Sequence, residues 1–114
     1  MQFKSNETIV SQIVAHVKRE IFSGRFSAGM KIPPIREFAG AISVNPNTVA
    51  KAYQELESEN LIYTDGTLGK FVSNNRLFLK KKREEYLQEQ MASFKAELKK
   101  CGVDEEEFLC LAKK

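Results

Sequence analysis

The stretch SVNPNTVAKAYQELE, residues 43–57, places a proline inside a pattern that otherwise predicts an amphipathic helix. Proline destabilises a helix interior, but the first helical turn tolerates it because the N–H that proline lacks has no partner there. Asn45, directly before Pro46, is a favourable N-cap residue. We therefore predict a helix that begins at Pro46 and runs to about Ser58. Apolar residues spaced three or four apart indicate its buried face: Val49, Ala52, Tyr53 and Leu56.

A shorter helix is predicted just before this one. Pro33 and Pro34 end any preceding element and favour a new helical start. The segment IREFAGAI, residues 35–42, then places its apolar side chains on one face. These side chains are Ile35, Phe38, Ala39 and Ile42. Two short helices joined by a tight turn at Ser43 and Val44 form a helix-turn-helix.

The segment before this motif predicts a further helix and a short strand. The helix is predicted over about Glu7–Ser23, capped by Ser5 or Asn6 and closed by Gly24. Its apolar stripe consists of Ile9, Ile13, Val17 and Ile21, widened by Val10, Val14 and Phe22. A loop follows, and residues 31–32 are predicted to form the strand.

After residue 60 the apolar residues no longer follow a helical period. LIYT and KFVS are predicted to be two short strands around the glycine-containing turn DGTLG, which together form a β-hairpin. A helix, a helix-turn-helix and a hairpin, in this order, make a winged helix-turn-helix. The predicted fold is therefore mainly α with a small β-hairpin wing.

Residues 76–114 are predicted to form a two-helix tail behind a winged helix-turn-helix domain of residues 1–75. The first tail helix contains no proline or glycine until Gly102, and Asp104 with Glu107 resembles the capping box of a last helix. Apolar residues of the first tail helix follow a heptad-like spacing and form a seam that suits dimerisation: Leu87, Met91, Phe94 and Leu98. Phe108 and Leu111 of the last helix are expected to fold against this seam and to contribute to the dimer. Packing of the tail on its own winged domain is the alternative.

Composition excludes several classes of function. The 114 residues carry a net charge of only +3, so nucleic-acid binding has to be argued from where the charges fall. No apolar run approaches the roughly 20 residues of a membrane span, and the polar start is not a signal peptide, so we predict a cytoplasmic protein without membrane contact.

The residue types that carry catalysis or bind metals are sparse. Cys101 and Cys110 lack a metal-ligand spacing and are expected to be reduced thiols, although their spacing also permits a disulfide. We predict no metal and no cofactor. His16 lies among apolar helix positions, and the chain has no nucleophile, phosphate-loop or acid-pair motif, so we do not predict an enzyme.

The exposed face of the helix that begins at Pro46 carries side chains suited to DNA. Asn47, Lys51 and Gln54 recur at i, i+4 and i+7, opposite the apolar stripe. Asn and Gln can pair bidentately with adenine in the major groove, and Lys can contact guanine or phosphate.

The two ends of this helix differ in charge. Asn47 and Thr48 occupy its first turn, where a recognition helix meets base edges and where backbone N–H groups suit a phosphate. Acidic residues gather at the other end, at Glu55, Glu57 and Glu59. This polarity favours a helix that approaches a polyanion with its first turn.

The stretch SGRFSAGMKIPPIREFAGAISVNPNTVAKAYQELESENLIYTDGTLGKFVS resembles the winged-helix DNA-binding domain of GntR-type transcription regulators. The matching features, in order, are SG-x₄-G, P-x-x-RE-x-A, VNPNTV, LE-x-E-x-LI and G-x-x-G-x-FV. With the first helix, the resemblance covers about residues 5–73. The version VNPNTV…AY…LE, followed only by residues 74–114, resembles the YtrA-like branch, whose members carry a short helical tail in place of a large ligand-binding domain.

The resemblance implies roles for individual residues. Arg36 would contact the DNA backbone or a guanine, and Gly66 at the wing tip would approach the minor groove. The set at the major groove would be Asn45, Pro46, Asn47 and Thr48, together with Lys51 as the nearest cation. On the hairpin, Thr67 and Lys70 are expected to add phosphate contacts.

Three positions depart from the pattern of these regulators. Ala50 stands where many relatives have an arginine in the recognition helix, and Pro34 stands where a serine is common. Ser43 stands where glycine is usual, which would cost about 1 kcal/mol if its φ is positive.

The implied function is sequence-specific regulation of transcription, as a repressor. A winged helix reads only a few base pairs, so a homodimer on a pseudo-palindromic double-stranded DNA operator is expected. The resemblance suggests ABC-type transporter or envelope-stress genes as targets. An unidentified small-molecule effector, if one exists, would bind between the tail helices or across the dimer.

Two alternatives from other classes stay open. One is a winged helix that serves as a protein-interaction module without binding DNA. The other is a small-molecule or metal sensor with its chemistry near Cys101, Cys110 or residues 105–107.

Overall fold

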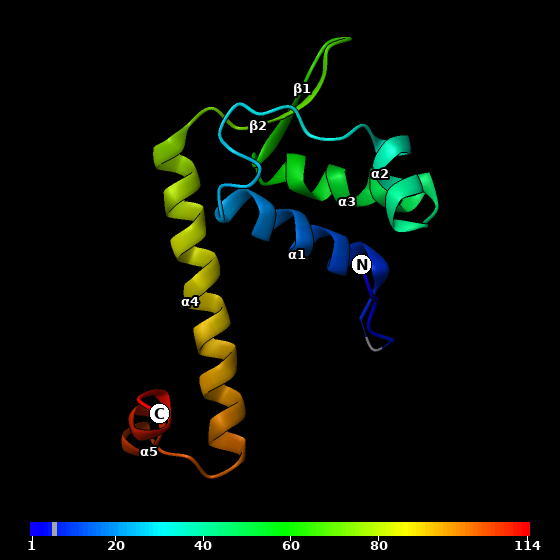
Figure 1. Cartoon of the computed structure of the whole chain (residues 1–114). Helices are drawn as coiled ribbons and strands as arrows, with labels where there is room; N and C mark the ends of the chain where they lie inside the picture. Colours follow the sequence, from blue (N-terminus) through cyan, green and yellow to red (C-terminus); the bar gives the residue numbers. More distant parts are fainter. Residues whose placement is uncertain (6) are drawn as a thin grey trace. The chain divides into compact units, whose positions relative to one another are not determined.

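The computed structural model describes residues 1–5 and 7–114. Its elements are α1 (Ile9–Phe22), α2 (Ile35–Ile42), α3 (Pro46–Ser58), β1 (Ile62–Asp65), β2 (Gly69–Val72), α4 (Arg76–Lys100) and α5 (Glu105–Ala112) (Figure 1). The fold is mainly helical with one two-stranded antiparallel sheet, which confirms the predicted fold class.

The chain separates into two compact units, residues 1–80 and 81–114. The division falls inside α4, whereas the domain boundary predicted from the sequence lies after residue 75. Phe78 and Leu79 of α4 pack against the core of the first unit, which is why that unit extends into the helix.

The core of the first unit lies between α1, α2 and α3, with the base of the hairpin against it. The stripe predicted for α3 is confirmed, because Val49, Ala52, Tyr53 and Leu56 are all buried. Tyr53 donates its hydroxyl hydrogen to the Pro33 carbonyl oxygen at 2.8 Å. Burial, with a smaller contribution from Glu37, raises the pKa of Tyr53 well above its ordinary value. On α2, Phe38 and Ala39 are buried, whereas Ile35 and Ile42 are only half-buried.

The start of α1 differs from the prediction. The helix begins at Ile9, and Thr8 caps it by accepting a hydrogen bond from the Ser11 N–H at 3.1 Å. The predicted cap at Ser5 is therefore wrong, and the alternative cap, Asn6, lies outside the described residues.

The buried stripe of α1 also differs from the prediction. Ile9 is 44% exposed, whereas Gln12 is buried. The Gln12 amide group accepts from the Lys4 N–H at 2.7 Å and donates to the Lys4 carbonyl at 2.9 Å. It is the amide's satisfied hydrogen bonds that make burial of this polar side chain tolerable.

The turn between α2 and α3 agrees with the sequence prediction. Ser43 ends α2 in the left-handed conformation, with φ 57° and ψ 49°. The Asn45 side chain then accepts from the Asn47 N–H at 2.8 Å, and Pro46 occupies the first turn of α3. The proline in the opening stretch therefore begins a helix.

The hairpin pairs Ile62 with Val72 at its base and Asp65 with Gly69 at its far end. Ile62 and Val72 are buried, and the hairpin projects beyond the helices of the first unit (Figure 1). The strand predicted at residues 31–32 is reduced to a single bridge between Lys31 and Phe71. Pro33 follows at once and has no N–H to continue the pairing.

The second unit contains most of α4 and all of α5. Gly102, with φ 79°, ends α4, and the Val103 N–H returns to the Leu98 carbonyl at 2.9 Å. Asp104 caps α5 by accepting from the Glu107 N–H at 2.8 Å, as predicted. Within the described residues no helix is long and apolar enough to span a membrane.

Candidate nucleic-acid interface

The N-terminal end of α3 presents a group of exposed polar residues. Asn45, Pro46 and Asn47 are exposed, and Thr48 is half-buried. The backbone N–H groups of this turn are already engaged, because the Asn47 N–H is held by the Asn45 side chain and the Thr48 N–H donates to the Asn45 carbonyl at 3.0 Å. These N–H groups thus have partners within the turn, and the expectation that they suit a phosphate stays a prediction.

The outer face of α3 continues this group along the helix. Lys51 and Gln54 are exposed on the face opposite the buried stripe, in line with Asn47. Lys51 forms no ion pair with any described residue. Its charge is therefore available to a phosphate or a guanine. Ala50, the next residue toward the N-terminus, is half-buried.

The acidic end of α3 is partly neutralised. Glu59 accepts from Lys18 of α1 at 3.1 Å, and Glu57 accepts from Lys70 of β2 at 2.5 Å. Glu55 is exposed and forms no ion pair within the described residues. The charge difference between the two ends of α3 is thus smaller than the sequence alone suggests.

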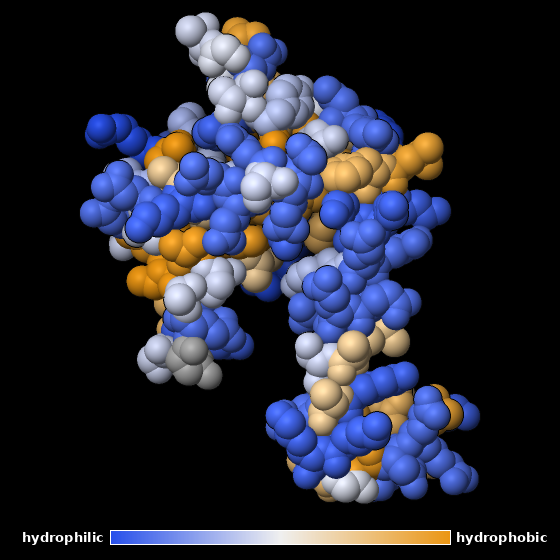
Figure 2. Space-filling view, turned by 180° about the vertical axis from the view of Figure 1, so that it is seen from behind, coloured by the Kyte–Doolittle hydropathy of each residue, from blue (hydrophilic) through white to orange (hydrophobic). Residues whose placement is uncertain are grey.

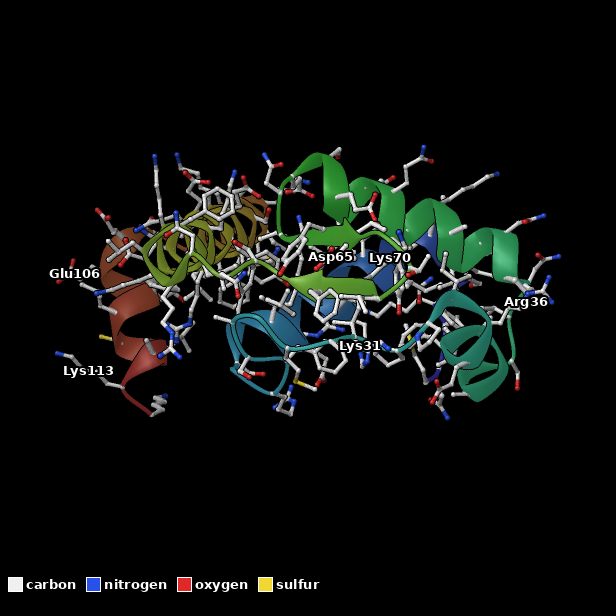
Figure 3. All side chains as sticks on the ribbon, turned by 90° about the horizontal axis from the view of Figure 1, so that it is seen from above. Lys31, Arg36, Asp65, Lys70, Glu106 and Lys113 are labelled. Atoms are coloured by element: carbon white, nitrogen blue, oxygen red, sulfur yellow. The ribbon has the colours of Figure 1, made fainter. Side chains whose placement is uncertain are left out.

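Arg36 is exposed in the first turn of α2 and makes no ion pair with a described residue. In Figure 3 its side chain extends outward from α2, whereas Lys70 and Asp65 lie at the hairpin. Pro34 precedes α2 at the cap position and provides no side-chain cap, as expected for a residue without a hydroxyl. Arg36 and Lys51 are thus cations on the two helices of the motif that pair with no acidic group in the part of the chain the structure describes.

The hairpin tip is open. Gly66 has φ 46°, Thr67 is exposed, and Leu68 is 62% exposed. A Cβ at Gly66 would meet no described atom within 4 Å, so only its backbone conformation favours glycine. This part of the wing can approach another surface closely.

Lys70 is engaged within the protein instead of extending to solvent. Its Nζ lies 2.5 Å from Glu57 Oε1 and 2.8 Å from Thr64 Oγ1. Burial by itself raises the pKa of the Glu57 carboxyl, but the hydrogen bonds from Lys70 and Thr64 and the Lys70 charge outweigh it, so the pKa lies below its ordinary value. Lys70 is therefore half-buried and bonded within the protein, whereas Thr67, the other hairpin residue expected to contact phosphate, is exposed.

Lys31 is a cation that the sequence analysis did not single out. It is exposed before α2, and its Cε would lie only 2.9 Å from a Cβ at Gly69, so it crosses the hairpin. A groove of about 330 Å³ runs here between Lys31, Ile35 and the hairpin residues Thr64, Leu68 and Lys70. The only sequence signal was that this lysine belongs to the short strand predicted at residues 31–32.

The tail carries exposed apolar side chains. Leu87, Met91 and Phe94 of α4 are 43%, 53% and 57% exposed, and Leu111 of α5 is 48% exposed. Leu98 and Phe108 are half-buried. Figure 2 shows such apolar patches among the hydrophilic surface of this unit. A surface of this kind is characteristic of an interaction site.

Within the second unit, α5 packs on α4 around an aromatic pair. The Phe94 and Phe108 rings meet edge to face with centroids 6.2 Å apart. A cavity of about 530 Å³ lies beside them, lined mainly by Ala92, Ala96, Val103 and Phe108 with Lys95 and Asp104 at its polar edge. Cys101 and Cys110 are free and exposed, and the described residues contain no cluster of three groups that could hold a metal.

Comparison with known proteins agrees with this architecture. The family profile described as "Bacterial regulatory proteins, gntR family" matches residues 9–72. The HTH-type transcriptional repressor YtrA of Bacillus subtilis is 42% identical over 72 residues, which cover 63% of this chain and 55% of YtrA. The matched part of the chain thus spans about half the length of that relative.

Solved structures show the same fold. A GntR family transcriptional regulator from Listeria monocytogenes is similar with a TM-score of 0.92 and 31% identity, over 97% of each chain. The DNA-binding domain of AraR, solved in complex with its operator ORX1, matches with a TM-score of 0.57 and 25% identity, over 63% of this chain and 93% of that one. The family profile covers more than half of the residues of this chain, and the chain has a winged helix-turn-helix fold. The chain therefore belongs to the GntR family of bacterial regulatory proteins.

Proposed function

We propose that this protein regulates transcription by binding a two-fold DNA operator as a homodimer, with α3 in the major groove and the wing at the adjacent minor groove. The observation that carries the proposal is the outer face of α3. Asn47, Lys51 and Gln54 are all exposed there, opposite a fully buried stripe, so three side chains able to read bases extend from one rigid helix. The exposed Arg36 adds a cation on the neighbouring helix.

The similarity to a named repressor supports repression as the direction of regulation. Expected targets are genes for ABC-type transporters or envelope stress, and the expected site of action is the cytoplasm. The apolar residues exposed on α4 and α5 support self-association through the tail. The cavity between α4 and α5 is the place where we expect an effector to bind, if the protein has one.

Selection of bound duplexes from a random DNA pool tests the proposal. We expect enrichment of a two-fold sequence, and an affinity that falls steeply with salt as counterions are released from the phosphates. Arg36→Ala and Lys51→Ala should each weaken binding to the selected duplex by about tenfold. Lys113→Ala, which removes an exposed cation from the end of α5, is the matched control and should bind like the unaltered protein.

The same experiment separates this proposal from a protein-interaction module. A module that does not bind DNA would enrich no sequence, and its weak binding to any duplex would not depend on Arg36 or Lys51. Enrichment of a single half-site without two-fold symmetry would contradict the dimeric mode of binding but not DNA recognition itself.

A further inference from the structure

Three side chains from three elements meet between α3 and the hairpin. Thr64 Oγ1 donates to Glu57 Oε1 at 2.8 Å and accepts from Lys70 Nζ at 2.8 Å, while Lys70 Nζ also donates to the same Glu57 oxygen. Glu57 lies in the last turn of α3, Thr64 in β1 and Lys70 in β2. We call these three residues the wing clamp.

The register of the hairpin explains why these residues meet. Thr64 and Lys70 are directly paired across the strands, two residues beyond the buried pair Ile62 and Val72. Side chains alternate along a strand, so both pairs share the face that turns toward α3. The apolar pair packs into the core, and Glu57 covers the polar pair that follows it.

Besides the clamp, backbone hydrogen bonds tie β2 to the segment before α2: the Ile32 N–H donates to the Lys70 carbonyl at 3.0 Å, and the Val72 N–H donates to the Met30 carbonyl at 2.9 Å. Residues 63–68 are exposed, and an isolated two-stranded hairpin is marginally stable in water.

The opposite face of the hairpin carries the stacked Tyr63 and Phe71 rings, 5.7 Å between centroids. There the Asn74 side chain donates to the Tyr63 hydroxyl at 3.1 Å, and the Lys31 side chain lies against Gly69. The clamp is partly shielded, since the Glu57 and Lys70 side chains are 32% and 23% exposed, which strengthens charged hydrogen bonds relative to a fully exposed pair.

We propose that Glu57 is a positioning residue for DNA binding, which holds Thr64 and Lys70 so that the wing tip has a fixed orientation relative to α3 before DNA arrives. In this role Lys70 bonds to Glu57 and Thr64 and does not contact a DNA phosphate. This inference rests on the proposed DNA-binding function. The clamp would strengthen DNA binding by preorganisation, because a wing that is already ordered loses less conformational freedom when it binds.

The two roles for Lys70 predict opposite effects of the same substitution. If Lys70 serves the clamp, Glu57→Gln loosens the wing and weakens DNA binding. If Lys70 is a phosphate contact, Glu57→Gln releases its ammonium group and removes a negative charge, so binding is unchanged or tighter. The sign of the change therefore decides between them.

The experiment compares Glu57→Gln with Glu55→Gln on the selected duplex. Both variants remove one negative charge from the same end of α3, but Glu55 forms no ion pair within the described residues. We expect Glu57→Gln to bind about fivefold more weakly than Glu55→Gln. Equal or tighter binding by Glu57→Gln would overturn the proposal.

A double-mutant cycle and the salt dependence provide a readout that general destabilisation does not mimic. Lys70→Gln and Glu57→Gln should each cost the same factor, and the double variant no more than either one, because both break the same clamp. Lys70→Gln should leave the slope of log affinity against log salt unchanged. A slope reduced by about 0.9 would identify a lost phosphate contact and contradict the clamp role.

A second substitution keeps the test valid if Glu57→Gln folds poorly. Thr64→Val removes the hydroxyl that bonds both charged groups and keeps a β-branched side chain in the strand. It should weaken binding about threefold, with urea unfolding still cooperative, and unchanged binding would count against the clamp. If the unaltered protein binds no duplex, the proposed function itself fails, whereas normal binding by all of these variants contradicts only the positioning role.

Discussion

Ser43 adopts a backbone conformation that glycine reaches at lower cost. Its φ of 57° ends α2 in the left-handed region, where the Cβ of any L-residue crowds the following backbone. Ser43→Gly should therefore stabilise the protein by about 1 kcal/mol, measured by the urea midpoint of unfolding. Ser43→Ala is the control, because it removes the hydroxyl and keeps the Cβ. An equal gain from Ser43→Ala would show that the strain does not come from the Cβ.

Asn45 shows which single-residue features the sequence could predict. An N-cap followed by proline is decided by local chemistry, so the start of α3 followed from three consecutive residues. The burial of Gln12 and the exposure of Ile9 could not be predicted in this way. The burial of Gln12 depends on Lys4, whose backbone bonds to the Gln12 side chain only once the chain has folded.

Removal of the Asn45 cap gives a prediction that the same local chemistry supports. Asn45→Ala leaves the Asn47 N–H without its partner and should destabilise the protein by about 1 kcal/mol, measured by thermal or urea unfolding. Asn45→Asp keeps an acceptor in the same place and adds a negative charge at the positive end of α3, so its stability should match or exceed that of the unaltered protein. A loss in Asn45→Asp as large as in Asn45→Ala would contradict the capping role.

At the scale of elements, α3 and the hairpin are joined by an ion pair that the sequence did not reveal. Lys70 looked like a free cation on a strand, and Glu57 looked like one of several acids at the end of a helix. Their contact spans 13 positions of sequence and exists only because the hairpin folds back over the last turn of α3. Element boundaries follow from local patterns, whereas such pairings require the arrangement of elements in space.

The lowered pKa of Glu57 makes the attachment of the hairpin depend on pH. Its folded pKa lies below the ordinary 4.5, so the ionised pair adds stability above that value, and this stability is lost as pH falls through the folded pKa. Between neutral pH and about pH 3, the unaltered protein should lose more unfolding free energy than Glu57→Gln, which has no proton to gain there. Urea unfolding at both pH values measures this difference. Glu55→Gln should keep the full pH dependence, and a flat response in the unaltered protein would show that the pair contributes nothing.

At the scale of the whole molecule, the two units differ in how far the sequence could describe them. The first unit has a buried core, and the periodic burial that forms the core is visible as a pattern in the sequence. In the second unit, residues 81–114, no residue is buried. Phe94 packs against Phe108 of α5, whereas Leu87 and Met91 of α4 are 43% and 53% exposed. The heptad-like spacing on α4 is typical of a helix that pairs with a second copy, and a single chain leaves this face uncovered.

Leu87 offers the sharpest test of that pairing. It is 43% exposed on α4, and a charge there would have to be buried without a partner in any dimer that uses this face. Leu87→Glu should give a monomer in analytical ultracentrifugation and weaken binding to the two-fold duplex by about 100-fold, because one half-site is then read alone. Leu109→Glu changes a leucine of α5 that is 54% exposed and lies outside the predicted dimer face, so it should remain a dimer.

The two readouts together distinguish a broken dimer from other defects. Leu87→Glu should still bind a single half-site as well as the unaltered protein does, since its α3 and wing are intact. Dissociation of Leu109→Glu but not of Leu87→Glu would place the interface on α5 rather than on the seam of α4. A dimer that persists in Leu87→Glu with full affinity for the two-fold duplex would show that the two copies of the chain pair through another surface.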